Sequence, residues 1–117
     1  MAKVSLVVYD FGRNTTQTIS AIRRRTSLPI SEISARIRDR EPVFEVRMWE
    51  LDVRDKVEVL RSLVEELGAL GASFEMFELM NDQSPRTVDS ERLIKVDLTK
   101  LNNLLLAHER QARQRHD

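Results

Sequence analysis

Residues 14–37 of this chain, NTTQTISAIRRRTSLPISEISARI, predict two helices joined by a short break. In the first half, Thr15, Ile19 and Ile22 recur at the spacing of one helical face. Pro29 disfavours helical geometry for Leu28, and its fixed φ suits the start of a new helix. The stretch therefore predicts a helical hairpin that breaks at these two residues.

The second helix of the hairpin has a narrow apolar stripe formed by Ile30, Ile33 and Ile37. Asn14 and Ser31 each carry a short polar side chain that can accept a hydrogen bond from a helix N-terminus. We expect Asn14 to cap the first helix and Ser31 to cap the second.

Alternating apolar residues predict strands over residues 3–10, 43–49 and 73–79. A longer helix follows Asp52, and Gly68 is placed to end it in the left-handed conformation. The order through residue 79 is then β-α-α-β-α-β. The helix after Asp52 has an apolar stripe of six residues, Val53, Val57, Leu60, Leu63, Val64 and Leu67.

The remaining residues predict an extension of the same domain. Residues 81–89 are polar and include Pro85, residues 92–96 suggest a short edge strand, and Asp97 can cap a last helix over about residues 98–112. We expect an α+β two-layer sandwich over residues 1–80, with residues 81–117 forming a linker and a helix packed on that domain. The helix carries an apolar stripe of Leu98, Leu101, Leu104 and Leu105.

Two packing predictions follow from these patterns. The main core is expected to join the hairpin isoleucines to the long helix and the strands, and it includes Ile19, Ile22, Ile33, Ile37, Leu60, Val64, Phe44 or Val46, and Val4 or Leu6. All three strands also carry apolar side chains on the opposite parity, so a second sheet face needs a cover. We expect the helix over residues 98–112 to supply it, within one chain or exchanged in a homodimer.

Residues 4–79 resemble the C-terminal domain of the bacterial ribosomal stalk protein. Residues 25–34, RTSLPISEIS, align without a gap with that family's a-T-G-L-G-L-K-E-A-K pattern. Residues 57–60, VEVL, and 64–69, VEELGA, resemble the family's third helix and its L-E-E-A-G-A ending. The resemblance implies the same α+β fold, which the adaptor that delivers N-degron substrates to the Clp protease also uses.

Comparison with the family pattern also identifies positions where this chain differs from the family. The stalk domain recruits translation factors through basic side chains of its hairpin, and Arg23 alone matches such a position. Arg36 stands where the family has a buried leucine, and the adaptor's acidic pocket is not recognisable in residues 9–12. Electrostatic recruitment of translation factors depends on those charges, so the fold is expected to serve another use. Family lysines are replaced by Thr15, Ser20, Ser31 and Ser34, and two glycines by Ser27 and Pro29.

Charge is balanced overall but uneven along the chain. Residues 1–40 carry 8 basic and 3 acidic side chains, whereas residues 41–90 carry 5 basic and 12 acidic ones. The hairpin arginines are the strongest polar feature, and guanidinium groups suit carboxylates and phosphates. The candidate partner-binding residues are Arg23, Arg24, Arg25 and Arg36. The alternative is that arginine stems simply cover the edge of the core.

Catalytic and metal-binding patterns are not found in the sequence. The two histidines, His108 and His116, lie far from matching carboxylates, and there is no cysteine, phosphate-binding loop or nucleophile elbow. We expect no enzyme activity, no cofactor, no metal site and no membrane span. The chain opens directly into a strand pattern, so a cytoplasmic location is expected.

The preferred function is a non-catalytic protein-binding module for a partner with an acidic surface, for example an inhibitor or immunity-type protein that blocks a toxin. One alternative is a nucleic-acid-binding domain that uses the arginine-rich hairpin; the neutral total charge and few aromatic residues disfavour it. Another is an accessory translation protein of the ribosomal stalk type.

Overall fold

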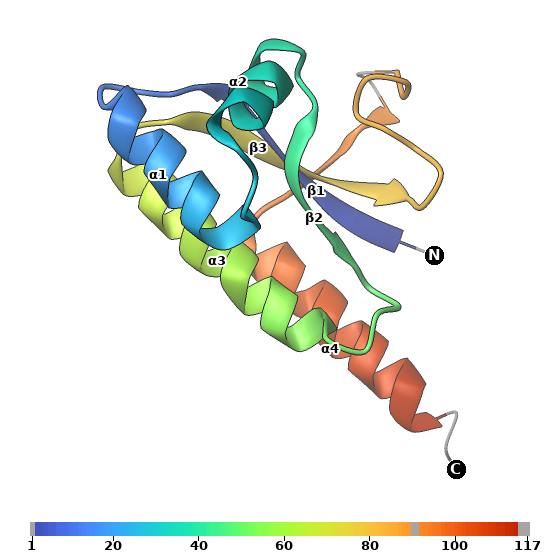
Figure 1. Ribbon diagram of the computed structural model, residues 1–117. Coiled ribbons are helices and arrows are strands. Elements are labelled where there is room, and N and C mark those ends of the chain that lie inside the picture. Colours follow the sequence, from blue (N-terminus) through green and yellow to red (C-terminus); the bar gives the residue numbers. More distant parts are fainter. Residues whose placement is uncertain (1, 90–91, 115–117) are drawn as a thin grey trace.

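The computed structural model describes residues 2–89 and 92–114, and over these residues it is a two-layer α+β fold (Figure 1). Four strands form one antiparallel sheet in the order β2-β1-β3-β4, and the helices cover one of its faces. In chain order the elements are β1 (Ala2–Asp10), α1 (Thr15–Thr26), α2 (Ile30–Arg38), β2 (Pro42–Arg47), α3 (Val53–Ala69), β3 (Ser73–Met80), β4 (Ile94–Val96) and α4 (Leu98–Gln114).

The hairpin of α1 and α2 forms as the sequence predicts, with one exception at its second cap. The side chain of Asn14 accepts a hydrogen bond from the backbone N–H of Gln17 at 3.1 Å, which satisfies an otherwise unpaired helix donor. The prediction for Ser31 is wrong, because α2 begins at Ile30 and Pro29 occupies the N-cap position. Pro29 is already in an extended conformation, so the chain enters α2 without a side-chain cap.

The end of α3 also differs from the prediction. The helix continues past Gly68 to Ala69, and the backbone N–H of Leu70 still donates to the carbonyl of Glu66 at 3.0 Å. Gly71 instead adopts the left-handed φ of +77°, two residues beyond the helix. A Cβ on Gly12 would lie 2.7 Å from the backbone of Gly71, so the two turns pack backbone to backbone and require glycine at Gly12.

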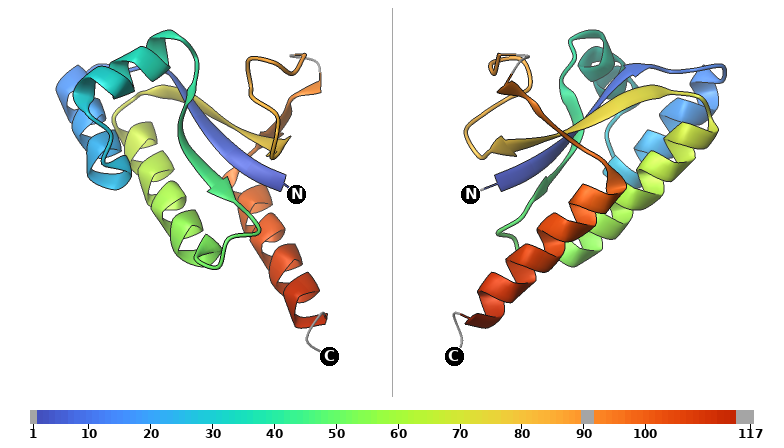
Figure 2. Two further views of the ribbon diagram at one scale, coloured as in Figure 1. Left: turned by 45° about the vertical axis from the view of Figure 1, so that its right-hand side comes forward. Right: turned by 180° about the vertical axis from the view of Figure 1, so that it is seen from behind.

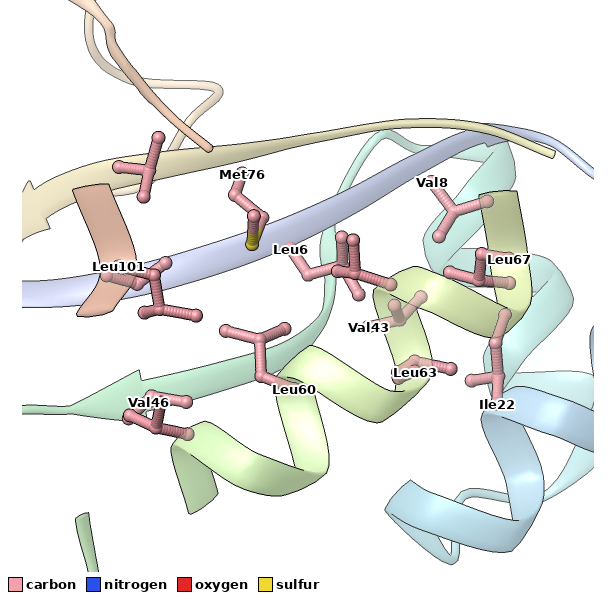
Figure 3. Close-up of a cluster of buried hydrophobic side chains, with 14 of the residues drawn as sticks. Leu6, Val8, Ile22, Val43, Val46, Leu60, Leu63, Leu67, Met76 and Leu101 are labelled. Carbon is pink, nitrogen blue, oxygen red and sulfur yellow. The ribbon is translucent and has the colours of Figure 1, made fainter. Parts of the chain in front are cut away.

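The core lies between the sheet and the helices, as Figure 3 shows. The predicted packing is confirmed: Ile22, Ile33 and Leu60 are fully buried in one cluster with the inward side chains of β1, and Ile19 and Phe44 pack against its margin. All six predicted stripe residues of α3 are buried.

Helix α4 covers a different face from the one expected. It lies beside α3 in both views of Figure 2, and Leu101 and Leu105 belong to the same core cluster as β1. The expectation that α4 covers the second sheet face is therefore wrong. Val96, the last residue of β4, points into the helix layer opposite Met76, and the chain turns at Asp97 onto that side.

The second sheet face is covered by the segment after β3. Val7, Phe77 and Leu79 form a small separate cluster, and Val88 and Leu93 pack against it. An ion pair between Arg86 and Glu41 (2.9 Å) ties this segment to the start of β2. Beside β2 this face is polar: Lys3 and Ser5 both contact the carboxylate of Glu45. The sequence interpretation overlooked Val88 and Leu93 as a cover.

Candidate partner-binding surface

Helix α1 presents a polar outer face because its buried residues, Ala21 and Ile22 among them, face the core. Thr18 and Ile22 point into the core, and the hydroxyl of Thr18 donates to the carbonyl of Phe11 at 2.7 Å. The helix contains no acidic residue, and all three of its arginines lie in the last turn, where cations complement the helix dipole. Its C-terminal end is therefore a concentration of positive charge.

Two of these arginines share one carboxylate. Nη2 of Arg24 lies 2.5 Å from Oε1 of Glu66 on α3, and Nη1 of Arg25 lies 2.5 Å from Oε2 of the same residue. Arg25 also donates from Nη2 to the hydroxyl of Ser62 at 3.0 Å. The Arg25 side chain is 21% exposed and joins α1 to α3, whereas that of Arg24 is 60% exposed.

The Glu66 carboxyl responds to both neighbours. Partial burial raises its pKa, but hydrogen bonds and charges from Arg25 and Arg24 outweigh this and hold the pKa below its ordinary value. Glu66 is thus ionised at neutral pH, and its single charge is divided between two guanidinium groups. One positive charge of the trio Arg24, Arg25 and Glu66 stays uncompensated.

Arg23 and Arg36 have different surroundings. The Arg23 side chain is exposed, and no ion pair forms between it and another described residue. Arg36 bonds from Nε to Glu32 at 3.0 Å and from Nη1 to the carbonyl of Pro42 at 3.0 Å, so it secures α2 to the start of β2. The structure therefore groups Arg24 and Arg25 around Glu66, while Arg36 has partners of its own.

A groove runs along the outer edge of β3, and the sequence interpretation missed it. Its volume is about 640 Å³. Its polar margin includes Glu75, Lys95, Asp97 and Thr99. Its apolar lining comes from α3, β3, β4 and the start of α4: Val64, Phe74, Met76, Val96 and Leu98. A sequence signal was present, since the predicted edge strand of residues 92–96 is shorter than the predicted strand of residues 73–79.

Side chains that could bind a metal ion are not brought together in the described part of the chain. No cluster of three or more His, Asp or Glu side chains suited to a metal ion occurs there. His108 is half-buried on α4, and His116 lies outside the described residues. Over the same residues, none of the helices has the length and apolar character needed to cross a bilayer.

Comparison of the chain with protein-family models, with curated proteins and with solved structures finds no match. The resemblance to the ribosomal stalk domain therefore stays a prediction from the sequence.

Proposed function

We propose that this protein is a non-catalytic protein-binding module that uses the outer face of α1 to contact an acidic surface on its partner. The observation that carries the proposal is the uncompensated positive charge at the end of α1. Two guanidinium groups share the single carboxylate of Glu66, and the exposed Arg23 has no ion-pair partner among the described residues. A partner carboxylate can pair with these groups without breaking an internal contact of the core.

The four candidate arginines do not have equal parts in this proposal. Arg23 and Arg24 are the contact residues, because their side chains are exposed. Arg25 and Arg36 act by holding α1 and α2 in position, since each bonds to a neighbouring element. A concrete form of the function is an inhibitor or immunity-type protein that covers a functional surface of a toxin.

The test uses charge reversal with a matched control. Arg23→Glu and Arg24→Glu should each slow association with a partner isolated from the native host, while the melting temperature changes little, because exposed ion pairs contribute only about 0–1 kcal/mol. Arg110→Glu makes the same change in net charge at an exposed position of α4 and should leave the association rate near that of the original protein.

Unchanged association rates for both α1 variants, measured by stopped-flow fluorescence, would reject the α1 surface. A second arm tests nucleic acid, the competing class of anionic partner. Tight binding of single- or double-stranded oligonucleotides that weakens steeply with salt, and that Arg23→Glu abolishes, would replace the protein-binding proposal with the nucleic-acid alternative.

A further inference from the structure

On its outer edge, β3 has a neighbouring strand beside only three of its eight residues. Strand β4 pairs with β3 only at Met76, Phe77 and Glu78, and the chain then turns at Asp97 into α4. Ser73, Phe74 and Glu75 pair with β1 on one side. On their other side no strand of the described chain lies against them. Unpaired edge backbone is a template for another strand.

At the opposite end of β3, a side chain pairs with the backbone edge. Beyond Glu78, the backbone N–H of Met80 donates to Oε1 of Gln83 at 2.9 Å, so a side chain of the following segment satisfies it. The unpaired stretch at residues 73–75 has no such cap among the described residues. The groove of about 640 Å³ lies along this stretch instead.

The lining of the groove shows that it follows the strand edge and not one sheet face. Phe74 and Met76 point toward the helix layer and Glu75 points to the second face, yet all three line the groove. Lys95 and Val96 of β4 show the same alternation. An occupant would therefore meet the backbone edge as well as side chains of both faces, and an extended backbone can pair with the outward N–H and C=O groups there.

Charge in the groove favours a basic occupant. Glu75 and Asp97 supply two carboxylates against the single amine of Lys95. Oε2 of Glu75 is buried and lies 3.1 Å from Nζ of Lys95, and it accepts no well-aligned hydrogen bond in the described chain. The Glu75 side chain is 34% exposed, so a cationic side chain of an occupant can pair with its carboxylate from the groove.

We propose that the edge of β3 at Ser73–Glu75 binds an extended peptide segment of another protein as an added strand. Alternate side chains of the segment are apolar and face Val64, Phe74 and Leu98, and the side chains between them are basic and face Glu75. A second copy of this chain is a poorer occupant. A three-residue edge is small beside the roughly 1,200–2,000 Å² that a stable protein interface buries. This site is separate from the α1 surface and does not depend on it.

The test uses a capped seven-residue peptide that alternates valine with lysine. Titration into ¹⁵N-labelled protein should shift amide resonances of residues 73–76 and 95–99 and slow amide exchange within residues 73–75. Two further peptides carry N-methyl groups on alternate amides, one in each register. One of them should lose binding, because its methyl groups face β3 and remove the donors, while its side chains are unchanged.

Two protein variants test the groove. Thr99→Trp, at an exposed position of the groove margin, should abolish peptide binding by filling the space. Ala107→Trp, exposed on the same helix and about 12 Å further along its axis, should leave binding unchanged. Arg23→Glu should also leave it unchanged, which distinguishes this site from the α1 surface.

Four outcomes would overturn the proposal. The first three are resonance shifts centred on α1 instead of β3, equal binding of both N-methylated peptides, and full binding by Thr99→Trp. Concentration-dependent dimerisation that Thr99→Trp abolishes would also reject the peptide, since the edge would then be occupied by a second copy.

Discussion

Ile22 shows what a single residue of the hairpin contributes. Its side chain is fully buried, on the helix face of the sheet, in the same cluster as Leu63 and Leu67 (Figure 3). Ile22→Ala should lower the free energy of unfolding by about 2–5 kcal/mol, because it removes buried methyl groups and leaves a cavity. Chemical denaturation measures the loss. Ile30→Ala, at a position that is 49% exposed, is the control and should cost far less; equal losses would contradict the packing.

The Glu66 carboxyl makes the stability of the fold depend on pH. Its carboxyl pKa is lower in the folded protein than its ordinary value of 4.5. The ion pairs therefore stabilise the fold above about pH 4.5, and this stabilisation is lost as the pH falls through the lower folded-state pKa. Glu66→Gln should reduce stability at pH 7 and flatten its decline in acid. Melting temperatures between pH 3 and pH 7 measure this, and parallel curves for the two proteins would contradict it.

Ser27 tests the break between the two helices. It lies just after α1 with a φ of +60°, a conformation in which a side chain is strained and glycine is not. Ser27→Gly should leave stability unchanged or raise it by up to about 1 kcal/mol, since relief of strain outweighs the greater freedom of the unfolded chain. Ser31→Gly, exposed in the first turn of α2, should destabilise by about 0.5 kcal/mol. A loss at Ser27 as large as that at Ser31 would argue against the left-handed cap.

At the scale of elements, each sheet face has its own cover. The helix face is closed by α1 to α4, with α4 antiparallel to α3 and joined to it near its far end by an ion pair between Arg54 and Glu109. The second face is closed by Val88 and Leu93. The two covers can be removed independently, which separates their roles.

Removal of residues 98–117 should uncover the apolar surface around Leu60, Met76 and Val96. We expect increased binding of a hydrophobic dye, aggregation and a large fall in the urea midpoint. The double variant Val88→Ser/Leu93→Ser keeps α4 and should lower the midpoint less, because these side chains are only half-buried. A truncated protein as stable as the full chain would show that α4 is not part of the fold.

At the scale of the whole molecule, the hairpin, the sheet and α4 share one cluster of buried residues. We therefore expect a single cooperative unfolding transition. Fluorescence of Trp49, the only tryptophan, reports on the connection between β2 and α3, and far-ultraviolet circular dichroism reports on all helices. The two midpoints should coincide in urea. A separate early transition in circular dichroism would mean that a helix unfolds on its own.

The burial of the α4 stripe also limits how two copies of the chain could associate. The apolar stripe residues Leu101 and Leu105 are buried within one chain, so a homodimer through α4 would have to use its outer side. A homodimer stays a prediction that sedimentation can test.

Periodic patterns in the sequence were sufficient to predict which segments form helices and strands, and in what order. Periodicity is a local property that determines on which face of its own element each side chain lies. Examples are the helical spacing of Val57, Leu60 and Val64 and the alternation of apolar residues in β1. The break at Leu28 and Pro29 is likewise local, because proline acts through its own backbone and that of its neighbour.

Tertiary structure decided how those faces meet. The stripe of α4 suits either side of a sheet, and the inward direction of Val96 and the turn at Asp97 select the helix layer. Pairing of Arg24 and Arg25 with Glu66 joins residues about forty positions apart, and no spacing rule predicts it. The groove beside β3 depends on where β4 ends against its neighbour. These features arise from contacts between elements, whereas a sequence pattern describes only the surface that one element presents.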